Sequence, residues 1–437
     1  MATAGRILMI PKGNYNSATT YEMLDVVSHN GTSWVAKKTA IGVEPSEANK
    51  EHWQCLVTAK EELKGMMGYV TPEMFGAKGD GVTDDTDAIQ MAVDSGFKEV
   101  VLTAGRNYYV TRQINLKDDV TICGSGTLSP IYGIWTPTTA FPSLIVDNTF
   151  VGDCVLKAEQ GRNSFHDFGI VNISQTANNK YVPTFDGIVI VKGRADVERV
   201  AVRGLKIGIN SDRCYVSMFN RLYLSACIVC FKVNYTSDSI FRNIFANTNG
   251  FMEDFMEKSV DFDNEKLIGI LNYGSHYFVG GKCEHCGYGF VHSPNGFTTI
   301  DNMIFDWNKI SLKIIRIVSR DYQQHLLITN CWFMSTTYHI ENDDRKIRIS
   351  ASDCVFSLSD GSAHEVMASV EGAGPEFAFR AYHETEGDMF IFNNCYLRNS
   401  AKTIFAYTPF SKVVLNFCDI GEATIGNVTN LVNNNSY

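Results

Sequence analysis

One short pattern recurs ten times along the chain, and this repeat restricts the possible folds more than any other feature. The pattern runs apolar, any residue, turn-tolerant residue, apolar, any residue, apolar. The ten copies begin at Phe165, Val197, Phe219, Phe241, Phe278, Ile300, Ile328, Ala351, Phe392 and Leu415. Between the fourth positions the steps are 32, 22, 22, 37, 22, 28, 23, 41 and 23 residues, so five of nine lie at 22 or 23. Such a period predicts a stacked repeat architecture.

The third position of the repeat has the chemistry of a sharp turn. It is Asn, Asp or Gly in seven of the ten copies, and these residues tolerate a positive φ. A β-sandwich has more closely spaced strands and does not repeat one turn chemistry at this interval. We therefore expect an all-β fold, a right-handed parallel β-helix, whose stacked asparagines bond from coil to coil. The cysteines at fourth positions should form an inward column: Cys331, Cys354, Cys395 and Cys418.

The longer steps predict insertions into the solenoid, at about 172–186, 247–271, 306–325 and 359–388. Long loops on a rigid scaffold often carry function. The 41-residue step leaves room for one further coil that the pattern does not align.

The first part of the chain does not contain the repeat and has a different residue pattern. Short segments with the pattern of β-strands occur here and contain Tyr21, Trp34 and Trp53. Asn30-Gly31 is a typical sequence for a hairpin turn. We expect a small β-rich module over 1–57, a helical linker over 58–70 and the solenoid over 71–437. A capping helix is expected at about 84–95, with Asp84 as its N-cap.

Charge and composition exclude several classes of partner. The net charge is −10, and because nucleic-acid affinity comes mainly from cations on phosphate, we expect no nucleic-acid partner. No run of apolar residues is long enough for a membrane span, and the N-terminal residues 1–13 do not form a signal-peptide pattern. We expect the twelve cysteines to be reduced thiols and no cofactor to be bound.

A segment that opens the solenoid resembles a known family. Residues 75–90, read with 101–108, closely resemble the start of the pectate-lyase-like β-helix domains of phage tailspikes and polysaccharide depolymerases. The resemblance covers about residues 70–437. It implies a capping helix over the open end of the solenoid, with Asp80, Asp84 and Asp85 in structural roles. It also implies a homotrimer, a place in the phage tail, and synthesis in the host cytoplasm.

The N-terminal segment 15–56 is similar to small carbohydrate-binding modules of the chitin-binding type, which also occur at the front of phage tail proteins. Whether such a module here binds sugar or the virion is left open. Tyr21, Trp34 and Trp53 are candidates for stacking on sugar rings, and the alternative is that they form the module's core. On the solenoid, Trp307 and Trp332 are candidates for the same role.

Catalytic residues are harder to identify. The Asn-Thr-Asp, Asp-Asp and Gly-His-Gly motifs of polygalacturonase-like hydrolases are absent in their usual context, which weakens the case for pectin hydrolysis. A glycosidase needs two carboxyl groups about 5–10 Å apart, and side chains one or two coils apart meet this requirement. Candidates within the insertions are Asp261, Asp263, Glu384, Glu386 and Asp388, which are otherwise solvated loop residues. A lyase would instead place Lys or Arg near a carboxylate.

A zinc site is a weaker hypothesis. Cys227-x-x-Cys230 and Cys283-x-x-Cys286 have metal-ligand spacing. However, strand residues three apart face opposite sides, so we expect no metal site.

Together these patterns predict a phage or prophage tail protein, a tailspike or tail fibre, that binds bacterial surface polysaccharide and contacts other tail or baseplate proteins. Whether it also depolymerises the glycan is open at this point. One alternative is a non-catalytic structural or adhesive tail component. Another is a bacterial carbohydrate-active enzyme, a glycoside hydrolase or polysaccharide lyase.

Overall fold

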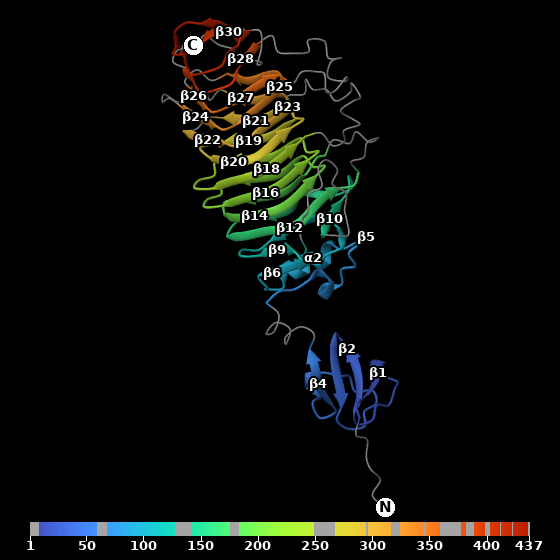
Figure 1. Ribbon diagram of the computed structural model, residues 1–437. Helices are drawn as coiled ribbons and strands as arrows, with labels where there is room; N and C mark the ends of the chain where they lie inside the picture. The colour runs from blue at the N-terminus through green and yellow to red at the C-terminus, as the bar shows by residue number, and fades with distance from the viewer. Residues whose placement is uncertain are drawn as a thin grey trace, which may run out of the picture. The chain divides into compact units, whose positions relative to one another are not determined.

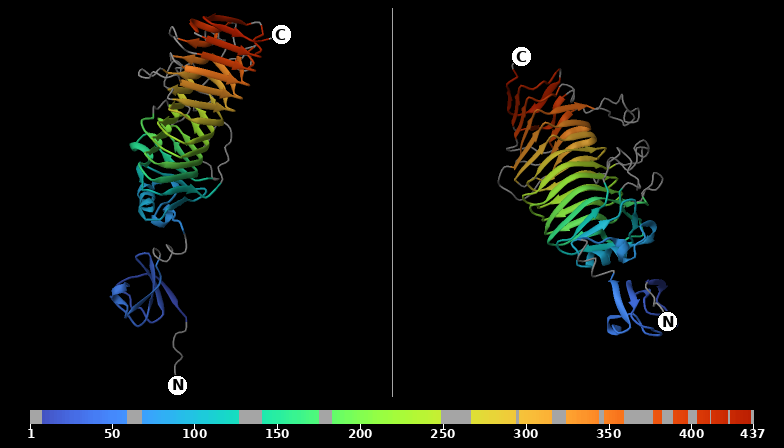
Figure 2. Two further views of the ribbon diagram at one scale, coloured as in Figure 1. Left: turned by 90° about the vertical axis from the view of Figure 1, so that its left-hand side faces the viewer. Right: turned by 60° about the horizontal axis from the view of Figure 1, so that its bottom comes forward.

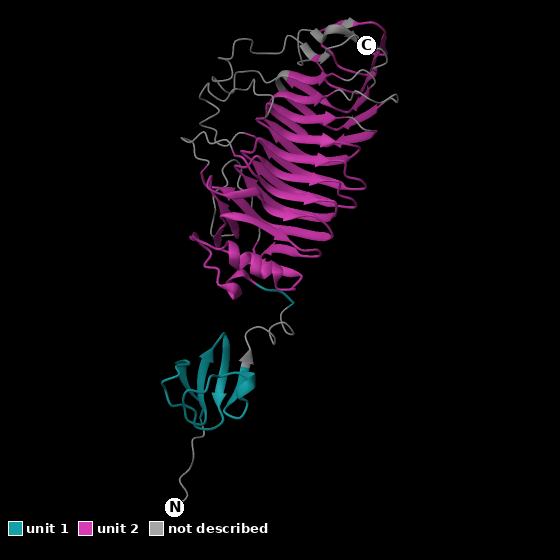
Figure 3. Cartoon of the chain, turned by 180° about the vertical axis from the view of Figure 1, so that it is seen from behind, with its two compact units in different colours: residues 1–70 teal, residues 71–437 magenta. Residues whose placement is uncertain are grey.

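The computed structural model describes residues 8–58, 68–126, 141–174, 183–248, 267–293, 296–315, 324–343, 347–358, 377–381, 389–397, 403–410, 412–421 and 423–435. The chain divides into two compact units, residues 1–70 and 71–437 (Figures 1 and 3). The linker predicted to be helical over 58–70 falls mostly outside the described residues.

The first unit is a four-stranded sheet in the order β1-β2-β3-β4. Its strands are β1 Ile10–Asn14, β2 Asp25–His29, β3 Thr32–Ala36 and β4 Trp53–Thr58, with a 3-10 turn, η1 Glu47–Asn49, before β4. Asn30 and Gly31 both have positive φ between the antiparallel strands β2 and β3, which is the backbone that a two-residue hairpin turn requires. The predicted hairpin is confirmed.

The second unit begins with a cap made of η2 Pro72–Phe75, β5 Asp80–Asp84 and α2 Thr86–Asp94. The predicted helix is present, but Asp84 is not its N-cap. Asp85 occupies that position, and its carboxylate accepts hydrogen bonds from the backbone N–H groups of Lys78 and Gly79 instead of from the helix. Asp84 accepts from the backbone N–H and hydroxyl of Thr86, so Asp84 and Asp85 together hold the turn and the helix start in place.

In the part of the second unit that the structure describes, twenty-nine strands belong to one sheet that winds through the stacked coils (Figure 2). The first ones after the cap are β6 Glu99–Leu102, β7 Asn107–Tyr109, β8 Arg112–Leu116, β9 Thr121–Gly124, β10 Ser143–Val146, β11 Val151–Ala158, β12 Arg162–Asn172, β13 Asp186–Val191, β14 Arg194–Arg203, β15 Ile207–Asp212, β16 Met218–Ser225, β17 Val229–Asn234 and β18 Ile240–Asn247. The middle ones are β19 Ile268–Tyr273, β20 Tyr277–Glu284, β21 Tyr288–Ser293, β22 Phe297–Asp301, β23 Ile304–Ile314, β24 Gln324–Thr329 and β25 Trp332–Asn342. The last ones are β26 Ile347–Ser352, β27 Val355–Leu358, β28 Phe377–Ala381, β29 Met389–Asn393, β30 Thr403–Phe410, β31 Lys412–Asn416, β32 Thr424–Val428 and β33 Leu431–Asn433.

Each coil of the solenoid has three faces. Face A is the stretch that precedes the third repeat position, face B is the stretch that follows it, and face C comes next along the chain. In β16, β18 and β20 one strand covers both faces A and B. On face A β16 pairs in parallel with β18 and β18 with β20, and on face C β15 pairs with β17 and β17 with β19. This all-parallel stacking of successive coils confirms the predicted β-helix.

The corner between faces A and B is the turn that the repeat predicts. All ten residues at the third repeat position have positive φ, including the seven that are Asn, Asp or Gly. They are Asp167, Arg199, Arg221, Asn243, Gly280, Asn302, Asn330, Asp353, Asn394 and Phe417. Side-chain hydrogen bonds between neighbouring coils also run along this corner. For example, the Asn394 side-chain amide donates to Asp353 Oδ1 over 2.6 Å.

The 41-residue step holds no further coil on faces A and B. Strand β26 pairs directly with β29, and Ala351 lies opposite Phe392. The same direct stacking holds across the 37-residue step, where Ile244 lies opposite Gly281. Insertions therefore leave the stacking register intact.

The interior of the solenoid is mostly apolar and includes the predicted cysteine column. All twelve cysteines are free, and the four at fourth positions are buried. Each of these four thiols lies near a backbone carbonyl of the preceding turn, as in Cys331 Sγ to Thr329 O at 3.1 Å. Small, weakly polar side chains thus fill the narrow corner.

Candidate functional site

Face B carries two outward columns of side chains that run along the solenoid. The column next to the corner contains Tyr223, Phe245, Lys282, Ile304, Trp332 and Val355. The second column, two residues further along each strand, contains Ser225, Asn247, Glu284, Asp306, Met334 and Ser357. These positions are half-buried or exposed, while the residues between them are buried, so the two columns face outward.

A charged triad lies at the centre of this face. The Lys282 ammonium is 2.7 Å from Asp306 Oδ2, and it forms a second ion pair with Glu284 Oε2. Glu284 and Asp306 are direct register partners on neighbouring coils. The Asn247 amide, one coil before, donates to Glu284 Oε1 over 3.2 Å. The three charged side chains are 18, 21 and 19% exposed, so they remain accessible to solvent.

The triad keeps its lysine protonated. Burial lowers the pKa of the Lys282 ammonium, but the hydrogen bonds and charges of Asp306 and Glu284 outweigh burial and leave that pKa above its usual value. Lys282 is therefore a cation that neutralises one of its two carboxylates.

Aromatic side chains flank the triad in the first column. The rings of Tyr223 and Phe245 stack on neighbouring coils, with centroids 5.1 Å apart and 7° between their planes. Trp332, two coils beyond Lys282, is 46% exposed, and its indole N–H donates to Ser357 Oγ over 3.2 Å. That bond holds the indole on face B while nearly half of its surface stays open to solvent.

This arrangement has the parts needed to hold and cleave a glycan. Coils are about 4.8 Å apart, so carboxylates on adjacent coils lie near the separation of about 5–5.5 Å that retaining glycosidases use. Exposed aromatic surface in the same column can stack on the apolar faces of sugar rings.

Sequence reasoning missed this triad because it searched for carboxylates in the insertions. Glu284 and Asp306 each lie three residues after the fourth repeat position, at Gly281 and Met303. Equal offsets from a repeat position stack one above the other, so this signal was present in the sequence. The carboxylates that were predicted, Asp261, Asp263, Glu384, Glu386 and Asp388, lie outside the described residues.

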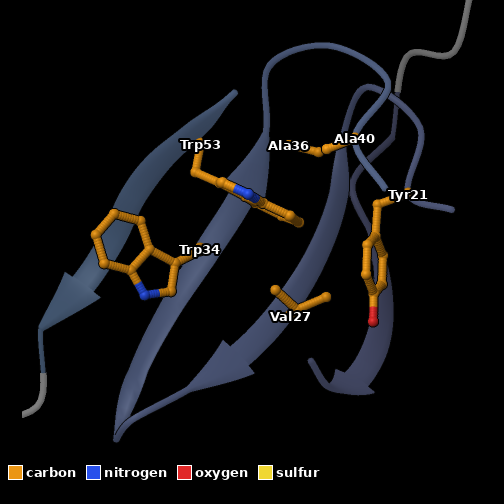
Figure 4. Packing of buried hydrophobic residues seen from close by; sticks show 6 residues of the cluster. All are labelled: Tyr21, Val27, Trp34, Ala36, Ala40 and Trp53. Atoms are coloured by element: carbon orange, nitrogen blue, oxygen red, sulfur yellow. The ribbon is translucent and has the colours of Figure 1, made fainter. Parts of the chain in front are cut away.

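The aromatic residues of the N-terminal module take the second of the two roles considered for them, that of a core. Tyr21, Trp34 and Trp53 are 2, 6 and 1% exposed and pack with Val27 and Ala36 in one apolar cluster (Figure 4). A module of this size has few residues with which to fill a core, so its largest rings are used there. None of the three offers a free face to a sugar, which corrects their predicted stacking role in favour of the core alternative.

The two tryptophans predicted on the solenoid lie in different settings. Trp332 is the exposed face B residue described above. Trp307 directly follows Asp306 at the corner between faces B and C, where it is half-buried with a positive φ. Trp307 is the chain neighbour of Asp306, and Trp332 lies in the column that contains Lys282. Only Trp332 belongs to an outward column.

The cysteine pairs do not form a metal site. Cys227, Cys230, Cys283 and Cys286 are all buried in the solenoid, and burial raises the pKa of the Cys286 thiol to about 12. Within the described residues, no group of three or more His, Cys, Asp or Glu side chains is arranged to hold a metal ion. None of the helices in the described part of the chain has the length and apolar character of a membrane-spanning helix.

A second lysine lies between two carboxylates on face C. Lys313 pairs with Glu341 and, over 2.7 Å, with Asp343. Its geometry resembles the face B triad, but Glu341 is only 3% exposed. Because a substrate cannot reach a carboxylate with so little exposed surface, face B holds the better candidate site.

Comparison with known proteins agrees with this fold. Residues 73–134 match the family model described as "Rhamnogalacturonase A/epimerase, pectate lyase-like". The match covers the cap and the first coils, which include the segment whose resemblance was noted in the sequence.

Two curated relatives come from Klebsiella phages. The chain is 24% identical over 335 residues to a "Depolymerase 1, capsule K30/K69-specific" of Klebsiella phage K5-2, covering 72% of this chain and 38% of that protein. A 44-residue stretch is 57% identical to a "Depolymerase 1, capsule KN3-specific" of Klebsiella phage KN3-1, covering 9% of this chain and 6% of that one. The chain thus spans less than half the length of the curated relatives it matches.

Solved structures share the architecture. The Dettilon tailspike protein superposes with a TM-score of 0.61 at 12% identity, covering 84% of this chain and 69% of that one. The catalytic unit of an alpha-1,3-glucanase from Streptomyces thermodiastaticus gives a TM-score of 0.50 at 12% identity, covering 85% and 69%. The second unit is therefore a right-handed, pectate-lyase-like parallel β-helix of the kind found in phage tailspikes.

Proposed function

We propose that this chain is a phage or prophage tail protein that binds bacterial surface polysaccharide along face B and cleaves it at Lys282, Glu284 and Asp306. The observation that carries the proposal is a pair of carboxylates on adjacent coils, on an accessible face that also presents aromatic surface. The capsule depolymerases among the relatives support the same reaction class. A tail protein of this kind would be part of the virion and would contact tail or baseplate proteins.

The chemistry follows from the two carboxylates. In glycoside hydrolysis one carboxyl group protonates the leaving oxygen while the other attacks the anomeric carbon or activates water. Glu284 and Asp306 supply these two groups. Lys282 holds them in one geometry, and such pre-alignment reduces the cost of reaching the transition state.

A non-catalytic adhesive protein is the second candidate. It is favoured by the ion pairs themselves, because a lysine between two carboxylates also forms in proteins as a purely structural contact. In that case face B would bind glycan through Trp332 and its neighbours without cleaving it. The carboxylates predicted in the insertions, Asp261, Asp263, Glu384, Glu386 and Asp388, are further proposals for an acid or base.

The test is cleavage of purified capsular polysaccharides, with a Klebsiella panel that includes the K30, K69 and KN3 capsules. The expected result is release of reducing ends from at least one polymer. Glu284→Gln and Asp306→Asn should each reduce the rate by about 10²–10⁴-fold, as removal of a general acid or base does, while binding to the same polymer is retained.

The control is Asp196→Asn on face A, an exposed carboxylate 3.6 Å from Arg194. It removes the same charge from a coil face far from the triad and should leave cleavage unchanged. Full activity of both face B variants would rule out the pair as the cleavage centre. Binding without cleavage by the native protein would favour the adhesive alternative.

A further inference from the structure

The triad on face B has no positive charge left over for a substrate. Lys282 is in contact with both Glu284 and Asp306, and Glu284 also accepts the Asn247 amide. One positive and two negative charges give the cluster a net charge of −1. A substrate that approaches it meets an acidic site.

The rest of the two outward columns does not change this balance. Among their described side chains, those beyond the triad are neutral: Tyr223, Phe245, Ile304, Trp332, Val355, Ser225, Asn247, Met334 and Ser357. The next residue in register with the second column is Arg203, in β14, which pairs with Ser225 and is only 5% exposed. Proteins that bind polyanions do so with accessible, uncompensated Lys and Arg, and among the described side chains of the two columns Lys282 is the one accessible cation.

The chemistry of cleavage points the same way. Elimination next to a uronate requires a base for the C5 proton and a cation that offsets the sugar carboxylate. Lys282 keeps its proton, so it is not such a base, and its charge is already used by Glu284 and Asp306. Hydrolysis needs only the two carboxyl groups.

We infer that the sugar bound over the triad is neutral or carries an amino group, with no carboxylate or phosphate, and that its glycosidic bond is hydrolysed. This rests on the proposed function and narrows its substrate class. For this step one of the two carboxyl groups takes up a proton from solvent. It gives that proton to the glycosidic oxygen as the bond from C1 to that oxygen breaks, and the partner carboxylate adds to C1. Water then supplies a hydroxyl to C1 and releases the carboxylate, and its remaining proton returns to the first carboxyl group. No oxidant or reductant is required.

The aromatic residues of the column suit such a sugar. Trp332 offers an exposed indole and Phe245 a ring that borders the triad, and both can pack on the C–H faces of a pyranose. Apolar stacking does not depend on charge, so a neutral ring loses nothing by the absence of free cations.

The first experiment measures binding of polygalacturonate, a plain polyuronate, by calorimetry at low salt. The native protein should bind it weakly. The double variant Glu284→Gln/Asp306→Asn releases the Lys282 charge and should bind at least about tenfold more tightly, equivalent to about 1.4 kcal/mol. Adding Lys282→Met should abolish that gain.

The matched control removes two negative charges from face A, in Asp196→Asn/Asp301→Asn. It changes the net charge of the protein by the same amount and should give no comparable gain. Tight binding of polygalacturonate by the native protein that is lost in Lys282→Met would overturn the inference, and so would an equal gain in the control. Thermal unfolding of each variant confirms that the fold is retained.

The second experiment follows the product of any polymer that is cleaved in the capsule panel. Hydrolysis incorporates one oxygen from heavy-oxygen water at the new reducing end and forms no unsaturated uronide. An unsaturated product that absorbs in the ultraviolet would overturn the inference while leaving depolymerisation intact. Absence of cleavage of every polymer would instead contradict the proposed catalytic function.

Discussion

At the scale of single residues, the corner between faces A and B decides which side chains are tolerated. Seven of its ten residues are Asn, Asp or Gly, but Arg199, Arg221 and Phe417 adopt the same positive φ. The strain of a positive φ at Arg199 is offset by its guanidinium, which donates two hydrogen bonds to the Asp167 carboxylate on the preceding coil, at 2.6 and 2.8 Å. Such bidentate pairs are among the stronger side-chain bonds. Nothing in the structure explains Phe417, whose ring is exposed.

The free-energy cost of a positive φ at this corner can be measured at Asn394, which has a φ of 51°. Asn394→Gly and Asn394→Val both lose the amide bond to Asp353, but only valine is strained at positive φ. We expect Asn394→Val to lower the free energy of unfolding by about 1–2 kcal/mol more than Asn394→Gly. Denaturant unfolding of both variants provides the comparison.

Asn393 is the matched control, since it lies next to Asn394 at the end of strand β29 and is not among the positive-φ residues. Asn393→Val should cost less than Asn394→Val, because valine suits an extended strand. Equal effects of valine at the two positions would contradict the turn assignment.

At the scale of elements, strands β19, β20 and β21 and the residues between them hold a buried chain of polar side chains. His276, which precedes β20, contacts Asn272 Oδ1 at 2.5 Å, and the Asn272 amide contacts His292 Nδ1 at 3.1 Å. His276 also contacts the Thr236 hydroxyl. His292 Nε2 is buried without a hydrogen-bond partner. Burial lowers the pKa of His276 to about 4 and that of His292, next to His276, to about 3.

These shifts predict acid sensitivity. An unfolded histidine takes up its proton near pH 6.5, whereas His276 and His292 stay neutral in the folded protein until about pH 4 and 3. The unfolded state therefore binds more protons below pH 6.5, and stability falls as the pH falls from there toward 4. Each histidine contributes up to about 1.4 kcal/mol per pH unit in this window.

Chemical denaturation between pH 7 and pH 4 measures this dependence. His292→Gln should make the pH dependence of the unfolding free energy shallower, whatever its effect on stability at pH 7. His325→Gln, at a half-buried position of β24, is the control. If His292→Gln leaves the pH dependence of the native protein unchanged, buried neutral histidine is not its source.

At the scale of the whole molecule, the solenoid presents long faces that an assembly can cover. On face A three successive coils expose Met218, Ile240 and Tyr277, which are direct register neighbours. A continuous exposed apolar stripe often marks an interaction surface. Closed cyclic symmetry is the usual way in which identical chains cover such surfaces, and we propose a homotrimer.

Light scattering on the purified protein tests the assembly. We expect a mass three times the chain mass of 48.7 kDa, or about 146 kDa. Ile240→Lys should lower it, because a charge would then replace apolar contact area. A mass near that of one chain across micromolar concentrations would contradict the trimer.

The sequence alone determined the solenoid, its corners and its inward cysteine column. These features depend on local rules, because a positive-φ turn and an alternating pattern act within a few residues and then repeat. The functional face needed the tertiary structure. Lys282 and Glu284 lie on one strand, whereas Asp306 is one full coil away in the sequence, and only the stacking of coils brings it to them. Burial is likewise a collective property: Trp34 and Trp332 are the same residue type, yet packing places one in a core and leaves the other on a surface.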